Sequence, residues 1–238
     1  MRKIILIISS LFVLPAVFAQ NKIVNDPNAQ VRKVGSFHAI RVATGIHLYL
    51  TQGNEETVAV SADIKESRDR IVTEVVNGVL KIHFDNHDWF WNDRNNRHLR
   101  AYVSCKILDE LKASSGAYVD VEGSINSGAI AMDFSSGASF KGNVTVKDLK
   151  VKQGSGAHST ISGTATAMIA DASSGSHIDA FDLQTSTCDA DASSGGHISI
   201  NVSKELNASA SSGGQIYYSG DASIRSINTS SGGHVSKK

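Results

Sequence analysis

The feature that most constrains the fold of this chain is a short cassette, Ser-Ser-Gly, that returns about every twenty residues. Residues 172–178 show its full form, Ala-Ser-Ser-Gly-Ser-His-Ile. Its glycine recurs in steps of 21, 19, 19, 20, 18 and 19 residues, at Gly116, Gly137, Gly156, Gly175, Gly195, Gly213 and Gly232. Self-similarity at a fixed period of this length is typical of stacked supersecondary units. The chain is therefore expected to form a repeat array.

The residues on both sides of each glycine alternate between apolar and polar. The third position after the glycine is apolar in every copy but one, which has Ser159 there. The second position after the glycine is mostly polar. The fifth position before the glycine is always apolar, as in Leu111, Met132, Val151, Ala170, Ala190, Ala208 and Ile227. Such alternation predicts strands with one buried face. Each repeat then reads as a strand, a tight corner in which Gly takes a positive φ, a second strand and a looser return.

One repeat of this size cannot bury its apolar side alone, whereas stacked repeats share a continuous core. The period and the short strands predict an all-β fold, a parallel β-solenoid with about 19–20 residues per coil. A β-propeller is the weaker alternative, because one blade needs roughly 40–50 residues. The calcium-binding nonapeptide solenoid is excluded, because its Gly-Gly-x-Gly-x-Asp repeats are absent.

The first residues of the chain have the pattern of a secretory signal. Arg2 and Lys3 precede an apolar run from residue 4 to residue 17, and residues 17–19 offer a cleavage site. The run is too short for a lasting transmembrane helix. We therefore expect an exported protein, in the periplasm, on the outer surface or secreted, with no membrane insertion after cleavage.

The rest of the chain divides by pattern into three parts. Residues 20–36 are polar and are expected to form a flexible leader. Residues 37–110 are rich in strand patterns but lack the Ser-Ser-Gly cassette, so they are expected to cap the stack. Residues 111–238 hold the tandem array.

Charge and cysteine content exclude some partners and bonds. The 23 basic and 23 acidic residues balance, which argues against nucleic acid as an electrostatic partner. Cys105 and Cys188 both fall on inward positions about four coils apart. Four steps of about 4.8 Å far exceed the span of a disulfide, about 4.4–6.8 Å between Cα atoms. Two buried free thiols are expected.

Three sequence features together resemble one protein family. They are the strand and turn at residues 44–53 (TGIHLYLTQG), the hairpin arm at 77–82 (NGVLKI) and the iterated cassettes. With the signal peptide, they resemble the head GIN domain family of auto-transporter adhesins, common in Bacteroidetes, over residues 37–235. The resemblance implies a right-handed parallel β-helix-like fold on an exported protein, and it suggests adhesion as the function.

The best ligand-binding candidates are Trp89, Phe90 and Trp91, in the irregular segment 85–97. Exposed aromatic side chains on a loop suit stacking on sugar rings or anchoring in a protein partner. The alternative is that they plug one side of the solenoid. The double change of Trp89 and Trp91 to Ala separates the two, because only a plug would lose several kcal/mol of stability.

Two further rows of polar side chains recur at fixed positions. His158, His177 and His197 occupy one slot in successive coils, where they form either a solvent-facing row or a ladder of rings that shares a metal ion. Asp133, Asp171 and Asp191 share another position of the repeat. We interpret them mainly as part of an outer face that keeps the protein soluble. No metal site and no catalytic residue are assigned.

The favoured function is that of a non-enzymatic exported solenoid, an adhesin or envelope scaffold that binds carbohydrate or a cell-surface protein. A β-helix polysaccharide-processing enzyme is one alternative, but it needs acidic and basic side chains converging from long loops. A periplasmic sensor domain with a protein partner is another. No cofactor is expected, because no Gly-x-Ser-x-Gly, His-Glu-x-x-His, Cys-x-x-Cys or phosphate-loop motif occurs.

Overall fold

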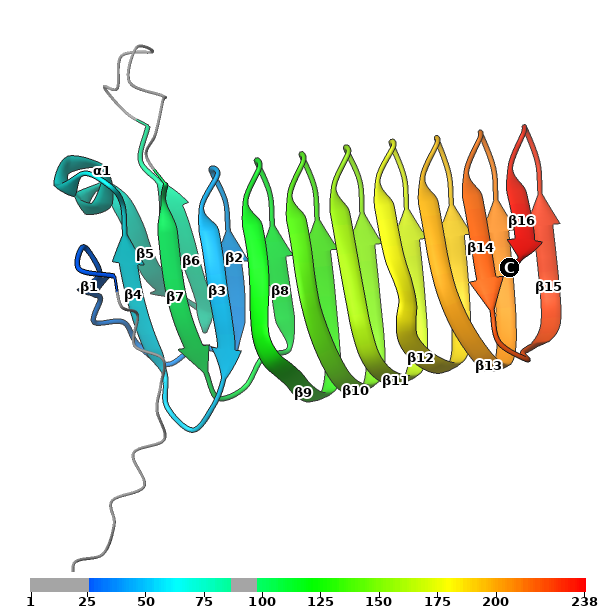
Figure 1. The fold of residues 1–238 in the computed structure, drawn as a ribbon, viewed down its shortest axis with the longest axis horizontal. Helices are drawn as coiled ribbons and strands as arrows, with labels where there is room; N and C mark the ends of the chain where they lie inside the picture. The colour runs from blue at the N-terminus through cyan, green and yellow to red at the C-terminus, as the bar shows by residue number, and fades with distance from the viewer. Residues whose placement is uncertain (1–25, 87–97) are drawn as a thin grey trace, which may run out of the picture.

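The computed structural model describes residues 26–86 and 98–238, and they form a β-solenoid (Figure 1). Strands make up 65 % of the described residues and helix 2 %. The first elements are β1 (Gln30–Val31), β2 (Ala39–Val42), β3 (His47–Gln52), β4 (Thr57–Ser61), α1 (Lys65–Asp69), β5 (Ile71–Val76), β6 (Val79–Phe84) and β7 (Arg100–Cys105). They are followed by β8 (Glu110–Ala113), β9 (Tyr118–Phe134), β10 (Ser139–Gln153), β11 (His158–Ala172), β12 (His177–Ala192), β13 (His197–Ala210), β14 (Gln215–Ser219), β15 (Ser223–Thr229) and β16 (His234–Lys237). The predicted all-β parallel solenoid is confirmed.

Each coil of the array wraps around two facing sheets (Figure 1). We call the front sheet the one that holds β3, β7, β14, β16 and the first halves of β9 to β13. The back sheet holds β2, β6, β8, β15 and the second halves of β9 to β13. All pairs from β9 onward are parallel, and β10 pairs with β11 from Ser139 to Gln153.

The return from the front to the back sheet is more regular than the predicted loose connection. A single bent strand carries the chain around this edge in β9 to β13. Most residues of the bend keep a ladder partner in the next coil, so their backbone groups stay hydrogen-bonded. Only short irregularities, such as the one between Thr160 and Gly163, absorb the unequal repeat lengths.

The opposite edge is built from the Ser-Ser-Gly turns. In the first cassette, Ser115 has φ 53° and Gly116 has φ 71°, and the N–H of Ala117 donates to the carbonyl of Ser114 at 3.1 Å. The equivalent hydrogen bonds of the other turns measure 2.8–3.2 Å. Two positive φ angles define a type I′ turn. The expected positive φ of the glycine is confirmed, and the preceding serine adopts one as well. The N–H of Gly116 donates to the carbonyl of Ser136 at 3.0 Å, so each turn is bonded to the next.

Paired positive φ angles also occur twice before the tandem array, at Asn77 and Gly78 between β5 and β6 and at Thr44 and Gly45. Thr44 has φ 64° and Gly45 has φ 70°, and the N–H of Gly45 donates to the carbonyl of Ser115 at 3.0 Å. The hairpin-like pair β2 and β3 therefore forms a coil stacked on β8 and β9. The repeat pattern of the sequence does not reveal this copy, because Gly45 is its only residue that matches the Ser-Ser-Gly cassette.

The coils are not stacked in chain order at the N-terminal end. The front sheet runs β4-β7-β3-β9, so the coil of β2 and β3 lies between β6 with β7 on one side and β8 with β9 on the other. Beyond β7 and β6 the pairing becomes antiparallel, with β4 on β7 and β5 on β6. Among the described residues, no helix has the length and apolar character needed to cross a membrane.

The core lies between the two sheets and follows the predicted pattern. Ile178 and Ile198 are fully buried and adjacent in register, whereas His177 and His197 face outward, as predicted. Ser159, the one serine at the third position after a cassette glycine, is also buried, and its hydroxyl lies 3.0 Å from the side-chain amide of Gln153. This pairing explains why a polar residue is tolerated there, since a buried hydroxyl without a partner is destabilising.

Both cysteines are buried and unpaired, as expected. The sheet order β7-β3-β9-β10-β11-β12 places five strand steps between the coils of Cys105 and Cys188. The predicted separation of four coils is therefore wrong by one, because the coil of β3 is inserted between β7 and β9. Burial raises the pKa of Cys105 to about 11 and that of Cys188 to about 12.

Candidate functional site

A hollow of the front sheet lies where β7, β3 and β9 run side by side. The register places His47 between Arg100 and Tyr118, and Tyr49 between Tyr102 and Asp120. All of these residues occupy outward positions, because they alternate with the buried residues of their strands. Three segments that are distant in sequence thus present one surface.

Four of these side chains form a continuous set of rings, which we call the ring cluster: Tyr102, Tyr49, His47 and Tyr118. The rings of Tyr49 and Tyr102 are stacked with centroids 5.1 Å apart, and those of His47 and Tyr49 are stacked at 4.2 Å. Tyr118 meets His47 edge-on at 4.6 Å. Stacked and edge-to-face pairs at such distances are stabilising beyond their buried area. The cluster is therefore a preformed aromatic surface.

A hollow of about 660 Å³ opens beside the ring cluster. This volume lies within the range of about 300–1,000 Å³ that small-molecule sites occupy. Its lining comes from two turn residues, two residues that precede β7 and the outward side chains of three strands: Thr44, Gly45, His47, Tyr49, His98, Leu99, Arg100 and Tyr118. The walls are thus mainly aromatic, with a small number of polar groups.

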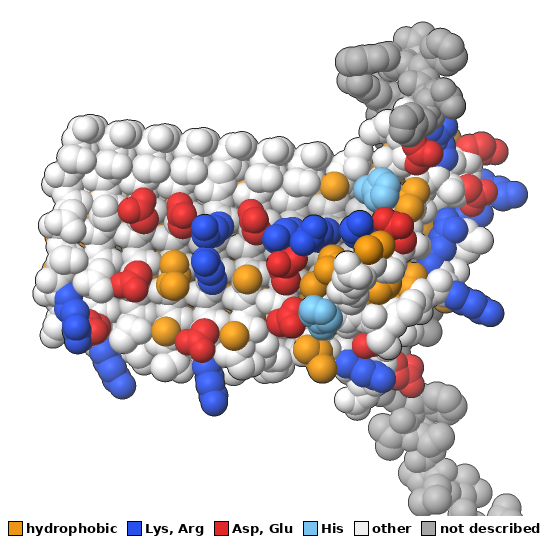
Figure 2. Space-filling view, turned by 180° about the vertical axis from the view of Figure 1, so that it is seen from behind, with side chains coloured by type: hydrophobic (Ala, Val, Ile, Leu, Met, Phe, Trp, Pro, Cys, Tyr) orange, Lys and Arg blue, Asp and Glu red, His pale blue; other side chains and the backbone are white. Residues whose placement is uncertain are grey.

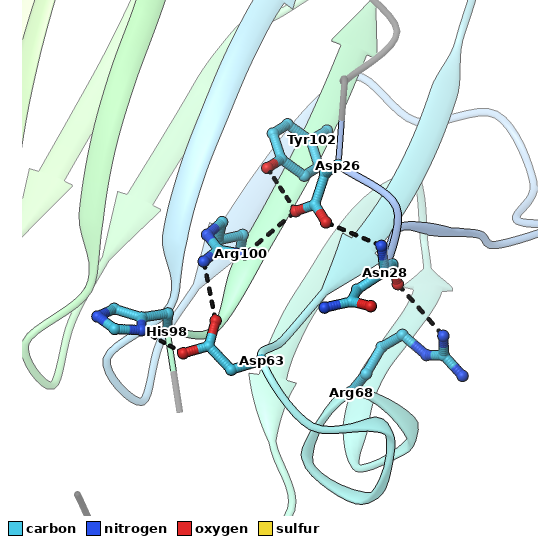
Figure 3. A network of polar contacts seen from close by, with 7 residues as sticks. All are labelled: Asp26, Asn28, Asp63, Arg68, His98, Arg100 and Tyr102. Carbon is cyan, nitrogen blue, oxygen red and sulfur yellow. Dashed lines mark hydrogen bonds and ion pairs between the residues drawn. The ribbon is translucent and has the colours of Figure 1, made fainter. Parts of the chain in front are cut away.

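A network of charged groups ties β7, one of the strands of the hollow, to neighbouring segments of the chain (Figure 3). The Arg100 guanidinium donates to the carboxylate of Asp26 at 3.1 Å and to that of Asp63 at 3.0 Å. The hydroxyl of Tyr102 also donates to Asp26, at 3.0 Å, and the ring of His98 contacts Asp63. Arg100 therefore ties β7 to the segments before β1 and after β4, and both of its carboxylate partners are already in place.

The surroundings of these groups shift their pKa values in consistent directions. Burial opposes ionisation of Asp26, but hydrogen bonds from Ser61, Asn28 and Tyr102, with the charge of Arg100, outweigh it and lower its pKa. Burial and the hydrogen bond to Asp26 raise the pKa of Tyr102 to about 12. The network is therefore ionised at Asp26 and protonated at Tyr102 near neutral pH.

His47 is the central ring of the cluster and is neutral near pH 7. Burial lowers its pKa, with Asp120 acting against the shift and Arg100 adding to it. Its Nε2 atom is buried and has no hydrogen-bond partner among the described residues. A charged imidazole would be costly in such a setting. His47 thus contributes a flat neutral ring rather than a charge.

The two remaining tyrosines differ from Tyr102. No hydrogen bond to another described residue engages the hydroxyl of Tyr49 or Tyr118, and Tyr118 is 37 % exposed. Their rings offer apolar faces and edges, and their hydroxyls can donate or accept. This combination suits a ligand with both apolar and hydroxyl-bearing surface.

The predicted ligand-binding residues Trp89, Phe90 and Trp91 lie outside the described residues. The segment that holds them connects β6 to β7, and the residues that follow it, His98 and Leu99, line the hollow. The ring cluster itself was not predicted as a site. Its sequence signal was the alternation through residues 46–50, in which His47 and Tyr49 occupy the outward positions.

The three histidines of the repeat row lie away from the hollow, on the front sheet at β11, β12 and β13. The rings of His158 and His177 are stacked with centroids 5.0 Å apart, and those of His177 and His197 at 4.3 Å. Within residues 26–86 and 98–238, no group of three or more His, Cys, Asp or Glu side chains could hold a metal ion.

The acidic row lies on the back sheet, opposite the hollow. Asp171 and Asp191 are neighbours in register, whereas Lys152 separates Asp133 from Asp171. Figure 2 shows acidic and basic side chains in rows across this face. These carboxylates do not converge with the hollow, so the structure brings no acidic pair into it from this row.

Comparison with known proteins agrees with the fold. A structure described as a putative adhesin from Bacteroides fragilis superposes with a TM-score of 0.80 at 17 % identity, over 88 % of this chain and 96 % of that one. A putative lipid binding protein from Parabacteroides distasonis gives a TM-score of 0.66 at 20 % identity, over 90 % and 98 %. A putative adhesin from Parabacteroides merdae gives 0.62 at 17 %, over 90 % and 97 %. At these identities the likeness extends to the fold alone.

A search of curated proteins gave no match. The family model described as "Putative auto-transporter adhesin, head GIN domain" matches residues 36–222, which is most of the chain. The match spans the ring cluster and nearly all of the array. The chain therefore belongs to the head GIN domain family.

Proposed function

We propose that this protein is an exported, non-enzymatic adhesin whose ring cluster binds carbohydrate. The observation that carries the proposal is the hollow of about 660 Å³ lined by His47, Tyr49 and Tyr118. Aromatic rings stack on the apolar faces of sugars, while free hydroxyls exchange hydrogen bonds with sugar hydroxyls. Membership of an adhesin family supports a binding role.

The charges of the hollow favour a neutral ligand. Arg100 is paired with two carboxylates at 3.0 and 3.1 Å, so its charge is compensated within the protein. His47 is neutral, and the hydroxyl of Tyr102 is bonded to Asp26. An anionic ligand would meet the carboxylates of Asp26 and Asp63 beside a single guanidinium, whereas a neutral saccharide needs only the rings and the hydroxyls of Tyr49 and Tyr118.

Trp89, Phe90 and Trp91 remain a sequence-based part of this proposal. They belong to the connection between β6 and β7, whose end at His98 borders the hollow. We propose that they add aromatic surface to the same ligand site. Changing Trp89 and Trp91 together to Ala should then abolish binding with little change in melting temperature. A fall of many degrees would instead assign them to packing.

The direct test measures binding of the purified protein to a panel of immobilised neutral oligosaccharides and polysaccharides. Tyr118→Ala should weaken binding at least about tenfold, since loss of a well-packed aromatic contact is worth 1.4 kcal/mol or more. Tyr217→Ala is the matched control, because Tyr217 is an outward front-sheet tyrosine away from the hollow. The proposal is contradicted if Tyr118→Ala binds saccharide as well as the wild type does. It is also contradicted if Tyr118→Ala and Tyr217→Ala lose saccharide binding equally.

A further inference from the structure

The second feature of the front sheet is a stack of three imidazoles, which we call the imidazole ladder: His158, His177 and His197. They stand at the same position of successive coils and pair directly in register. Their planes are nearly parallel, at 19° and 10°, with centroids 5.0 and 4.3 Å apart. Each ring therefore lies face to face with the next.

The C-terminal residues pack against this ladder. The ring of Tyr217 lies 5.0 Å from that of His197, and His234 follows at 6.2 Å from Tyr217. The ammonium of Lys238 sits 5.1 Å from the centre of the Tyr217 ring and 4.7 Å from that of Phe181. The ladder and the last coil thus form one contiguous aromatic surface with a cation at its end.

The groups that face the ladder mostly oppose its protonation. Burial lowers the pKa of His177, and the neighbouring His197 and His158 add to this effect while Asp179 opposes it. Burial also lowers the pKa of His197, with Lys238 adding to the shift, and Asp179 and the hydrogen bond with Gln215 opposing it. The hydroxyl of Ser199, 3.4 Å from His197 Nε2, is neutral. Asp179 is thus the one carboxylate acting on both rings among the described residues.

The last coil is less protected by the core than the coil before it. Ile198 is fully buried in β13, but Tyr218, Ala222 and Val235 of the last coil are only partly buried. Ile224 and Ile227 of β15 are 41 % and 42 % exposed. Elements with few buried apolar contacts open at low free energy. Opening of β14 to β16 would remove Tyr217 and Lys238 from beside His197.

We propose that the C-terminal coils are acid-sensitive, so that protonation of His197, the ladder ring next to Tyr217, detaches β14, β15 and β16 from the solenoid. A positive charge on His197, whose ring stacks on that of His177 at 4.3 Å and lies 5.0 Å from that of Tyr217, is opposed by burial and by the ammonium of Lys238 in the last coil. Neutral rings at the same spacing attract. The ladder thus converts a fall in pH into loss of local order at one end of the protein.

The sign of the effect follows from linkage between protonation and folding. His197 has a folded-state pKa below the unfolded value of 6.5, and detachment of the last coil removes Lys238 and part of the burial that lower it, so the opened state takes up protons more readily. The contribution of neutral His197 to stability is complete above pH 6.5 and is lost as the pH falls through the lower folded value. Each unit of pKa depression corresponds to a tenfold change in the opening constant.

The test is amide hydrogen exchange at pH 7.5 and pH 5.0, corrected for the intrinsic effect of pH on exchange. In the wild type, residues 215–238 should lose protection at pH 5.0 relative to residues 119–151. The double variant His177→Gln, His197→Gln should lose this difference. Glutamine fits, because Gln215 already occupies the same slot. His83→Gln, on β6 away from the ladder, is the matched control and should respond like the wild type.

A second variant keeps the test decisive if the double variant folds poorly. Lys238→Ala removes a cation that opposes protonation of His197, so it should reduce the response to acid without removing any ring. The proposal is wrong if the wild type shows no selective loss at residues 215–238. If the double variant folds, the proposal is also wrong when that variant responds to acid as strongly as the wild type. If the double variant does not fold, Lys238→Ala decides in the same way.

Discussion

The two ends of the front sheet use the same outward positions in different ways. At one end the ring cluster of Tyr102, Tyr49, His47 and Tyr118 takes different residue types from three strands that are distant in sequence. At the other end the imidazole ladder repeats one residue type through β11, β12 and β13. The ring cluster lines a hollow next to the ion pairs of Arg100. The imidazole ladder is a single row of like side chains.

The difference shows what repetition can and cannot build. Duplication of a coil copies each outward residue to a neighbour about 4.8 Å away, so it produces rows of like groups. Like ionisable groups in a row oppose their own charging. A site with complementary groups instead requires coils that differ, and here the insertion of the coil of β3 between β7 and β9 supplies them.

The largest expected effect concerns the core that both ends share. Ile198→Asp places an unpaired carboxylate at a fully buried position of β13 and should destabilise the protein by about 4 kcal/mol. Ile169→Asp is the matched control, because Ile169 is 48 % exposed on the back sheet, and it should cost less than about 0.5 kcal/mol. Urea denaturation measures both. Equal midpoints for Ile198→Asp and the wild type would refute the inward assignment.

The next effect concerns the ion pairs of Arg100, which are found at the end with the ring cluster. Arg100→Ala removes both charge-assisted hydrogen bonds and leaves the carboxylate of Asp26 largely buried without its cation. We expect a loss of about 1–3 kcal/mol, measured by thermal or urea unfolding. Arg41→Ala, which breaks a more exposed pair with Glu110, should cost about 0.5 kcal/mol or less. Similar losses in the two variants would mean that the network is not structural.

The two ends should also respond to acid over different ranges. The folded-state pKa of Asp26 is lowered, so its contribution is complete above the unfolded value of about 3.9 and is lost as the pH falls through the lower folded value. Protection of residues 57–61 and 100–105 against hydrogen exchange should therefore persist at pH 5.0, where residues 215–238 are already loosened. Asp26→Asn should remove the response of residues 57–61 and 100–105 below pH 4. Simultaneous loss at both ends near pH 6 would contradict this distinction.

The smallest effect concerns the two thiols, one at each end. The pKa of Cys105 is about 11 and that of Cys188 about 12, because both are buried. Native protein at pH 8 should react with iodoacetamide only slowly, and more slowly at Cys188, because the thiolate is the reactive form. Both should react quickly in denaturant. Mass spectrometry of unreduced protein reads the labelling, and a linked peptide pair would show that the coil count is wrong.

Much of the array could be predicted from sequence, because the pattern is local and repeated. The outward direction of His177 and the burial of Ile178 follow from alternation around the glycine. The ring cluster could not be predicted in the same way. Tyr102, Tyr49 and Tyr118 become neighbours only through pairing of β7, β3 and β9, and neither turn type nor periodicity specifies which coil lies beside which.

By itself, the sequence determined the period, the direction of each side chain and the position of the tight turns, since these depend on backbone preferences within a few residues. The tertiary structure alone decided that the coil of β2 and β3 stands between β6 with β7 and β8 with β9. That order follows from pairing across long loops and from burial of the shared core, which depend on the whole chain. The hollow at His47 exists because of that order.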